Sequence, residues 1–99
     1  MNIRKWDRQM TSPAQGDVLA LLAKEWVYSG PPGIMDISDI VAVLPLAPSE
    51  AFAALKDLFT DGLVDMDALK TSAFLTPEGF AAAESIAKGE RWPAPVTES

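Results

Sequence analysis

The stretch LAPSEAFAALKDLFTDGLVD, residues 46–65, decides the fold. It predicts a helix from Pro48 through Thr60, because proline is favoured in the first helical turn and the apolar residues that follow recur three or four positions apart. These inward positions are Ala51, Ala54, Leu55 and Leu58. Gly62 fits the left-handed position just beyond the helix. The alternation of apolar and acidic residues over 63–67 then predicts a half-buried strand.

Two helices are predicted before this stretch. Ser12, followed by a proline, begins the first helix, which ends within residues 28–30. Its helically spaced apolar residues are Val18, Leu19, Leu21, Leu22, Trp26 and Val27. Asp36 caps the second helix, with Asp39 at a spacing like that of a capping box, and Pro45 ends it. The buried face of this second helix consists of Ile37, Ile40, Val41 and Leu44.

A hairpin and a last helix complete the order. Residues 73–75 pair back on the acidic strand, with 68–72 as the tip, and residues 34–35 form a short additional strand. Thr76, followed by a proline, caps a helix that ends at Lys88. Its inward residues are Phe80, Ala83, Ile86 and Ala87. This succession of elements predicts a winged helix-turn-helix, a mainly α fold with a small β-hairpin wing.

The chain divides into three parts. We expect an N-terminal arm over 1–11, the winged-helix domain over 12–89 and a flexible tail over 90–99. No apolar run approaches the ~20 residues that cross a bilayer. No hydrophobic segment follows the charged N-terminal residues, so we expect no signal peptide, no membrane partner and a cytoplasmic location.

Three motifs resemble those of the MarR family. Residues 46–65 resemble the recognition-helix region, TSPAQGDVLALLA at 11–23 resembles the preceding helix, and LTPEGFAAAESI at 75–86 resembles the start of the helix after the wing. Together they extend over about three quarters of the chain, and they include few of the family's dimerisation helices. The resemblance implies a transcription regulator, usually dimeric, with helix 48–60 in the major groove and the wing on the DNA backbone.

The composition excludes several classes of protein. The 99 residues include neither Cys nor His, which excludes disulfides, thiolate metal sites and histidine-based catalysis. Asp61, Asp65 and Asp67 form the only acidic cluster, and no EF-hand or glycine-rich phosphate loop accompanies it. We therefore expect no enzymatic activity, no metal site and no cofactor.

The charge argues against the function that the motifs imply. The formal net charge is −6, and residues 36–62 hold one cation, Lys56, against five acids. The acids are Asp36, Asp39, Glu50, Asp57 and Asp61. DNA binding requires Lys and Arg that neutralise phosphates. An acidic helix-turn-helix would repel them.

Two functions follow from these conflicting signals. If the protein binds double-stranded DNA, the contacting residues are Ser49 and Lys56 on the helix, Lys70 and Thr71 on the wing, and Arg4 and Lys5 in the arm. The alternative is a protein-interaction module that does not bind DNA and forms a homodimer or contacts another protein. Its contact residues are Phe52 and Phe59, seven positions apart on one side of the helix, with Trp6 and Trp92. A simpler interpretation is that one or both phenylalanines contact no partner and pack within the protein, beneath the wing or the arm.

Overall fold

The computed structural model describes residues 12–88, so the arm and the tail lie outside the described residues. In chain order the elements are α2 (Pro13–Ser29), β1 (Met35–Asp36), α3 (Ile37–Val43), α4 (Pro48–Thr60), β2 (Val64–Met66), β3 (Ser72–Leu75) and α5 (Pro77–Ala87). The predicted winged helix-turn-helix, mainly α with a small hairpin wing, is confirmed.

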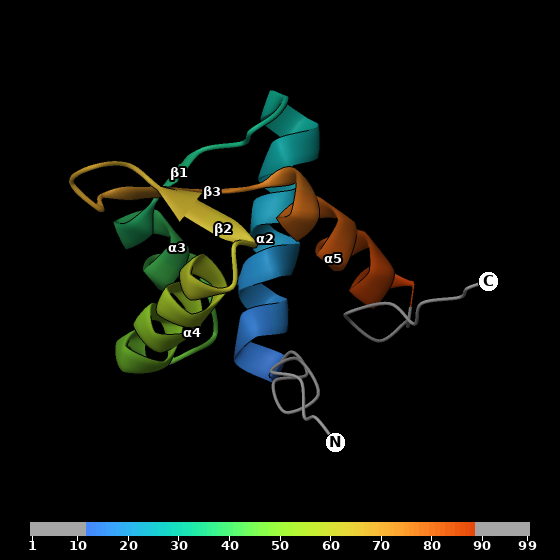
Figure 1. Ribbon diagram of the computed structural model, residues 1–99. Coiled ribbons are helices and arrows are strands. Elements are labelled where there is room, and N and C mark those ends of the chain that lie inside the picture. Colours follow the sequence, from blue (N-terminus) through green and yellow to red (C-terminus); the bar gives the residue numbers. More distant parts are fainter. Residues whose placement is uncertain (1–11, 89–99) are drawn as a thin grey trace, which may run out of the picture.

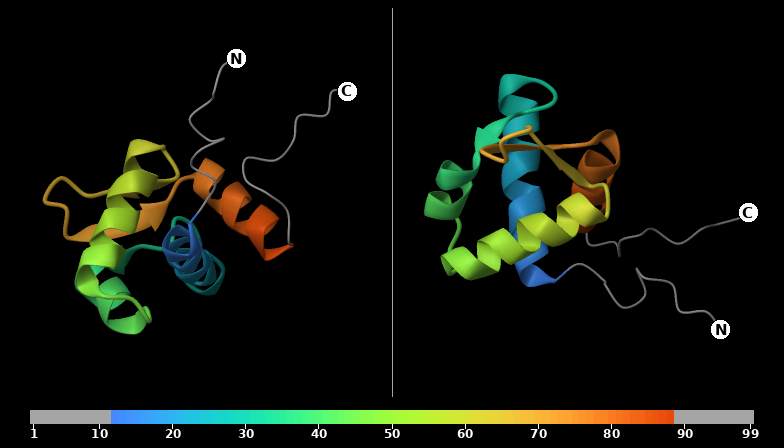
Figure 2. Two further views of the ribbon diagram at one scale, coloured as in Figure 1. Left: turned by 90° about the horizontal axis from the view of Figure 1, so that it is seen from below. Right: turned by 60° about the vertical axis from the view of Figure 1, so that its left-hand side comes forward.

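Helix α2 forms the centre of the molecule (Figure 1). It packs against α4 on one side and α5 on the other, and the end-on view in Figure 2 shows α2 lying between these two helices. Its residues Val18, Leu19 and Leu22 are fully buried. The core of the domain therefore forms around α2, and the two outer helices occupy opposite sides of it.

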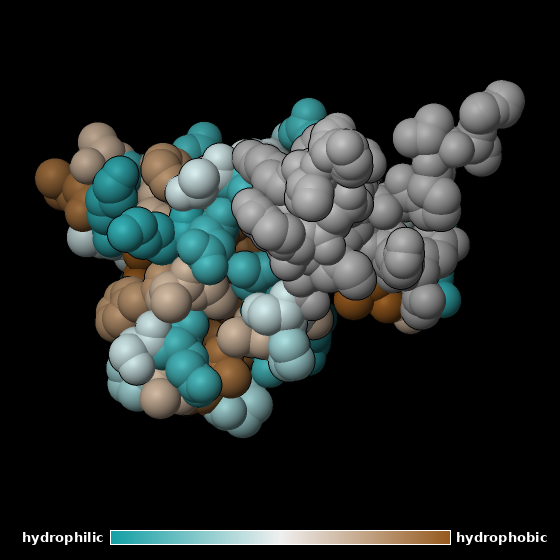
Figure 3. All heavy atoms as spheres, turned by 60° about the horizontal axis from the view of Figure 1, so that its bottom comes forward, coloured by the Kyte–Doolittle hydropathy of each residue, from teal (hydrophilic) through white to brown (hydrophobic). Residues whose placement is uncertain are grey.

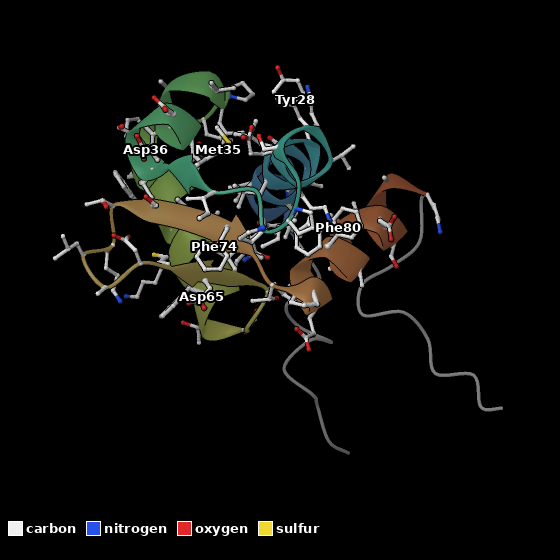
Figure 4. All side chains as sticks on the ribbon, turned by 90° about the horizontal axis from the view of Figure 1, so that it is seen from above. Tyr28, Met35, Asp36, Asp65, Phe74 and Phe80 are labelled. Atoms are coloured by element: carbon white, nitrogen blue, oxygen red, sulfur yellow. The ribbon has the colours of Figure 1, made fainter. Side chains whose placement is uncertain are left out.

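The sheet has three antiparallel strands in the order β1-β3-β2. Strands β2 and β3 form the predicted hairpin. Strand β1 pairs with the other edge of β3 through the pairs Met35–Ala73 and Asp36–Ser72. Figure 4 shows Met35 and Asp36 beside the sheet strand that carries Phe74. The short strand therefore lies one residue later than the predicted 34–35.

Helix starts follow the predicted caps with one exception. The Ser12 Oγ accepts from the Gln15 N–H at 3.2 Å, and the Thr76 Oγ1 accepts from the Gly79 N–H at 3.0 Å. Asp36 is the N-cap residue of α3, as predicted, but its side chain makes no capping hydrogen bond, so the expected capping box does not form. Pairing of β1 with β3 turns the Asp36 carboxylate toward the Ser72 hydroxyl, 3.4 Å away.

Two predicted core residues face solvent instead. Val27 is 73% exposed, and Ala87 is exposed on the last turn of α5. Both keep the helical spacing of core positions, but no described element covers them. They line a hollow between α2 and α5, which is described below.

The wing tip is organised by Asp67. Its Oδ1 accepts from the N–H groups of Thr71 and Ser72 at 2.6 and 2.8 Å, and its Oδ2 accepts from the Thr71 hydroxyl at 2.9 Å. These bonds, the Ser72 N–H above all, hold the pKa of Asp67 below its ordinary value. Lys70 takes the left-handed conformation at φ +58° in this tip. The Ile37 N–H donates to the Thr71 carbonyl at 2.9 Å and thereby links the tip to the start of α3.

Gly79 provides a first test of the packing between α5 and the hairpin. A Cβ at this position would overlap the Leu63 carbonyl, so Gly79→Ala should lower the free energy of unfolding by about 1–3 kcal/mol despite the better helix propensity of alanine. Gly16→Ala is the matched control, since nothing lies within 4 Å of a Cβ there and alanine should stabilise α2 by up to about 1 kcal/mol. Urea unfolding measures both, and an unchanged stability of Gly79→Ala would contradict the packing described.

The hydrogen bonds of Asp67 provide a second test. Because folding lowers its pKa, the carboxylate stabilises the tip above the unfolded value of about 3.9, and this contribution is lost as the pH falls through the lower folded value. The amide NMR shifts of Thr71 and Ser72 should titrate with a midpoint below about 3.9. Asp67→Asn should abolish this titration and speed amide hydrogen exchange at the tip.

Asp65→Asn is the control for the Asp67 experiment, since the Asp65 carboxylate accepts from the N–H of Met66 on β2 and not from the tip. It should leave the titration of Thr71 and Ser72 in place. A midpoint at or above the ordinary value in the unmodified protein would refute the account of the tip.

Candidate nucleic-acid interface

The outward side of α4 carries no acid. At about 100° per residue, the stripe opposite the buried face consists of Ser49, Ala53, Lys56 and Thr60, all exposed. The buried face is the predicted one, with Ala51, Ala54, Leu55 and Leu58. The most protruding part of the helix is therefore small, polar or basic.

Both acids of α4 lie on one flank of this stripe and bond within the domain. The Glu50 carboxylate accepts from the Ala47 N–H at 3.2 Å, which satisfies a free amide at the helix start. The Asp57 carboxylate accepts from Gln15 Nε2 of α2 at 3.4 Å. The negative charge counted over residues 36–62 is thus not distributed evenly over the surface. On α4 it is directed away from the outward stripe.

The opposite flank carries the two phenylalanines. Phe52 is 53% exposed and Phe59 is 38% exposed. The Lys70 Nζ of the wing lies 4.8 Å from the centroid of the Phe59 ring, a cation–π contact. Packing beneath the wing therefore applies to Phe59, whereas the Phe52 ring stays open.

The wing brings one cation to this surface. Lys70 lies at its tip, beside the α4 flank that holds Phe59. Thr71 differs from Lys70, because its N–H and its hydroxyl both donate to Asp67. In this conformation the Thr71 hydroxyl proton is not available to a phosphate. Figure 3 looks onto the molecule from the lower side of Figure 1, and hydrophilic and hydrophobic residues alternate over the part that is not grey.

The remaining candidate residues are not brought to this surface by the structure. Arg4, Lys5, Trp6 and Trp92 lie outside the described residues. Within residues 12–88, no three carboxylates gather in a way that could hold a metal ion. In the same residues, no helix combines the length and the apolar character that a membrane span requires.

A second feature, a hollow of about 620 Å³ between α2 and α5, was not predicted. Its lining is mainly apolar and includes Gly16, Ala20, Ala23 and Val27 of α2, and Ala83 and Ile86 of α5. Phe80, which also lines it, stacks on Trp26 with the ring centroids 4.6 Å apart. Figure 4 shows Phe80 on α5 facing α2 and Tyr28 pointing away from the body of the domain. The sequence did contain a signal for this hollow, since the small residues at positions 16, 20 and 23 share one stripe of α2.

Comparison with known proteins gives structural likenesses only. No protein-family model matches the sequence, and no curated protein matches it. The structure of NadR in complex with 4-hydroxyphenylacetate, a MarR-family protein, superposes with a TM-score of 0.68 at 21% identity over 85% of this chain. A mutant of Lactococcus lactis ZitR gives a TM-score of 0.59 at 22% identity over 79% of this chain. The chain spans 58% of the NadR chain and 51% of the ZitR chain.

A candidate DNA-binding protein from Ralstonia eutropha JMP134 has a similar size. Its TM-score is 0.61 at 29% identity, and the match covers 77% of this chain and 96% of that one. The likenesses to NadR and ZitR concern the fold. Taken with the element order, the three likenesses confirm the predicted fold, a winged helix-turn-helix that resembles those of MarR-family proteins.

Proposed function

We propose that the protein is a transcription regulator that binds double-stranded DNA, with α4 in the major groove and the wing tip on the backbone. The observation that carries the proposal is the acid-free outward stripe of α4, Ser49, Ala53, Lys56 and Thr60. In helix-turn-helix proteins the second helix presents such a stripe to the base edges. The likeness to the candidate DNA-binding protein of R. eutropha supports the same function, because the match covers 96% of that protein.

The charges of this surface imply weak and salt-sensitive binding. Among residues 12–88, Lys56 on α4 and Lys70 on the wing are the cations placed to meet phosphates. Two phosphate contacts give a slope of about −2 in log K against log salt for each protomer. The net charge of −6 adds repulsion, so we expect dissociation constants near the micromolar range at about 50 mM salt.

Charge reversal tests this assignment. Lys56→Glu and Lys70→Glu should each weaken binding to a mixed-sequence duplex about tenfold at about 50 mM salt and flatten the salt slope by about one, because each removes one phosphate contact. Fluorescence anisotropy over a salt series measures both quantities. Lys88→Glu makes the same charge change at the end of α5, on the other side of α2 from α4, and should have little effect (Figure 1).

Two results would contradict the assignment. If Lys88→Glu weakens binding as much as Lys56→Glu, the effect reflects net charge and not the α4 surface. If the unmodified protein binds no duplex at about 50 mM salt, DNA binding is excluded. The remaining function is then the protein-interaction module that uses the Phe52 and Phe59 flank.

We further propose that the protein acts as a homodimer and that a second copy covers the hollow between α2 and α5. Val27 is 73% exposed and Tyr28 is 88% exposed beside this hollow, and exposed apolar patches of this kind usually mark interaction sites. The hollow lies across α2 from α4 (Figure 2). A dimer formed there leaves both copies of α4 free to enter successive major grooves.

A matched pair of exposed valines tests the dimer. Val27→Asp places a charge in the hollow and should raise the dimer dissociation constant at least about tenfold, because it desolvates a carboxylate in an apolar contact. Val43→Asp is the control, since Val43 is 61% exposed at the end of α3, away from the hollow. Sedimentation equilibrium gives the dissociation constants. Equal effects of the two variants, or a monomeric unmodified protein at all concentrations, would rule out this interface.

A further inference from the structure

Helix α4 lacks the side chains that most often read bases by hydrogen bonds. Arg pairs with guanine and Asn or Gln pairs with adenine through two hydrogen bonds in the major groove. Residues 36–62, which include the whole helix-turn-helix, hold no Arg, Asn or Gln. Lys56 is the sole cation of this segment, and as a single point charge it suits a phosphate as well as a base.

The two carboxylates of α4, which could read cytosine, are engaged within the domain. Glu and Asp can accept from the cytosine amino group. In α4, however, the Glu50 carboxylate is bonded to the Ala47 N–H and the Asp57 carboxylate to the Gln15 amide. Both acids lie on the flank away from the outward stripe. Among the base-reading side chains of this helix, Lys56 is therefore the one left open for a guanine, and no Asn, Gln or unbonded carboxylate is available for adenine or cytosine.

What α4 exposes instead is hydrocarbon. The Phe52 ring is 53% exposed, the Ala53 methyl lies on the outward stripe, and Thr60 adds a methyl group near the helix end. Phe52 and Ala53 lie in the second turn, within the N-terminal half of the helix, which is the half that contacts base edges in helix-turn-helix proteins. Thymine alone presents an apolar group, its C5-methyl, in the major groove.

We propose that α4 recognises thymine through its C5-methyl group, with Phe52 and Ala53 as the specificity-determining residues. The ligand class is then duplex DNA whose half-sites carry thymines where the second turn of α4 meets the groove. This inference rests on the DNA-binding function proposed above. It adds the chemical group that is read, which neither the fold nor the charges specify.

The test compares duplexes that differ only in major-groove methyl groups. An A·T-rich duplex is measured beside the same duplex with every thymine replaced by uracil, which keeps the base pairing and the phosphate charge. Anisotropy should show weaker binding to the uracil duplex, by about fourfold for each methyl group contacted. A G·C-rich duplex should bind weakly, and replacing its cytosines by 5-methylcytosine should restore part of the affinity.

Two phenylalanine variants locate the contact on the protein. Phe52→Ser should abolish the difference between the thymine and uracil duplexes while leaving residual salt-dependent binding. Phe59→Ser is the matched control on the same flank, since its ring lies under Lys70, and it should change affinity for both duplexes alike. Both residues are exposed, so the variants should remain folded, which circular dichroism would check.

The outcomes separate this inference from the function on which it rests. Equal affinity for the thymine, uracil and G·C duplexes would overturn methyl reading and leave DNA binding intact. A thymine preference that persists in Phe52→Ser would overturn the role of Phe52. Failure to bind any duplex would overturn both proposals together.

Discussion

The structure depends on the burial of one side of α2. Val18, Leu19 and Leu22 are fully enclosed where α2 meets α4, β3 and α5, and each such side chain contributes about 1.5–3 kcal/mol by leaving water. Because a single 17-residue helix supports the helix-turn-helix on one side and α5 on another, a further stripe of it stays uncovered. The position of helix α4 and the presence of the hollow both follow from where α2 is packed.

Features set by neighbouring residues were predictable. The caps at Ser12 and Thr76 and the left-handed Gly62 follow from bonds and sterics within a few positions. Features set by distant residues were not. Asp36 has the composition of a cap, but Ser72, 36 positions away, determines where its carboxylate points. Val27 has the spacing of a core residue, yet whether a helix stripe is covered depends on the number and placement of its neighbours.

The candidate interface shows the same division. The sequence placed Ser49, Lys56, Phe52 and Phe59 on α4 correctly, because helical geometry fixes their directions relative to one another. It did not indicate that Asp57 bonds to Gln15, 42 positions earlier, or that Lys70 covers Phe59. A charge count over residues 36–62 treats all acids as equal. The bonds of Glu50 and Asp57 show where these two carboxylates point, which a count of charges does not reveal.

If the protein binds DNA as proposed, the acidity of its winged-helix domain has a physical use. Non-specific affinity comes almost entirely from counterion release, so a surface that offers two cations among the described residues, Lys56 and Lys70, would bind arbitrary sequence weakly. Contacts with thymine methyl groups are short-range and independent of salt, and they add only where the sequence supplies them. A second copy on the same duplex then multiplies the gain without adding phosphate contacts per protomer. In the proposed complex, the low charge of α4 would lower the affinity for all DNA, and discrimination would come from the hydrocarbon of Phe52 and Ala53 and from the spacing of two half-sites.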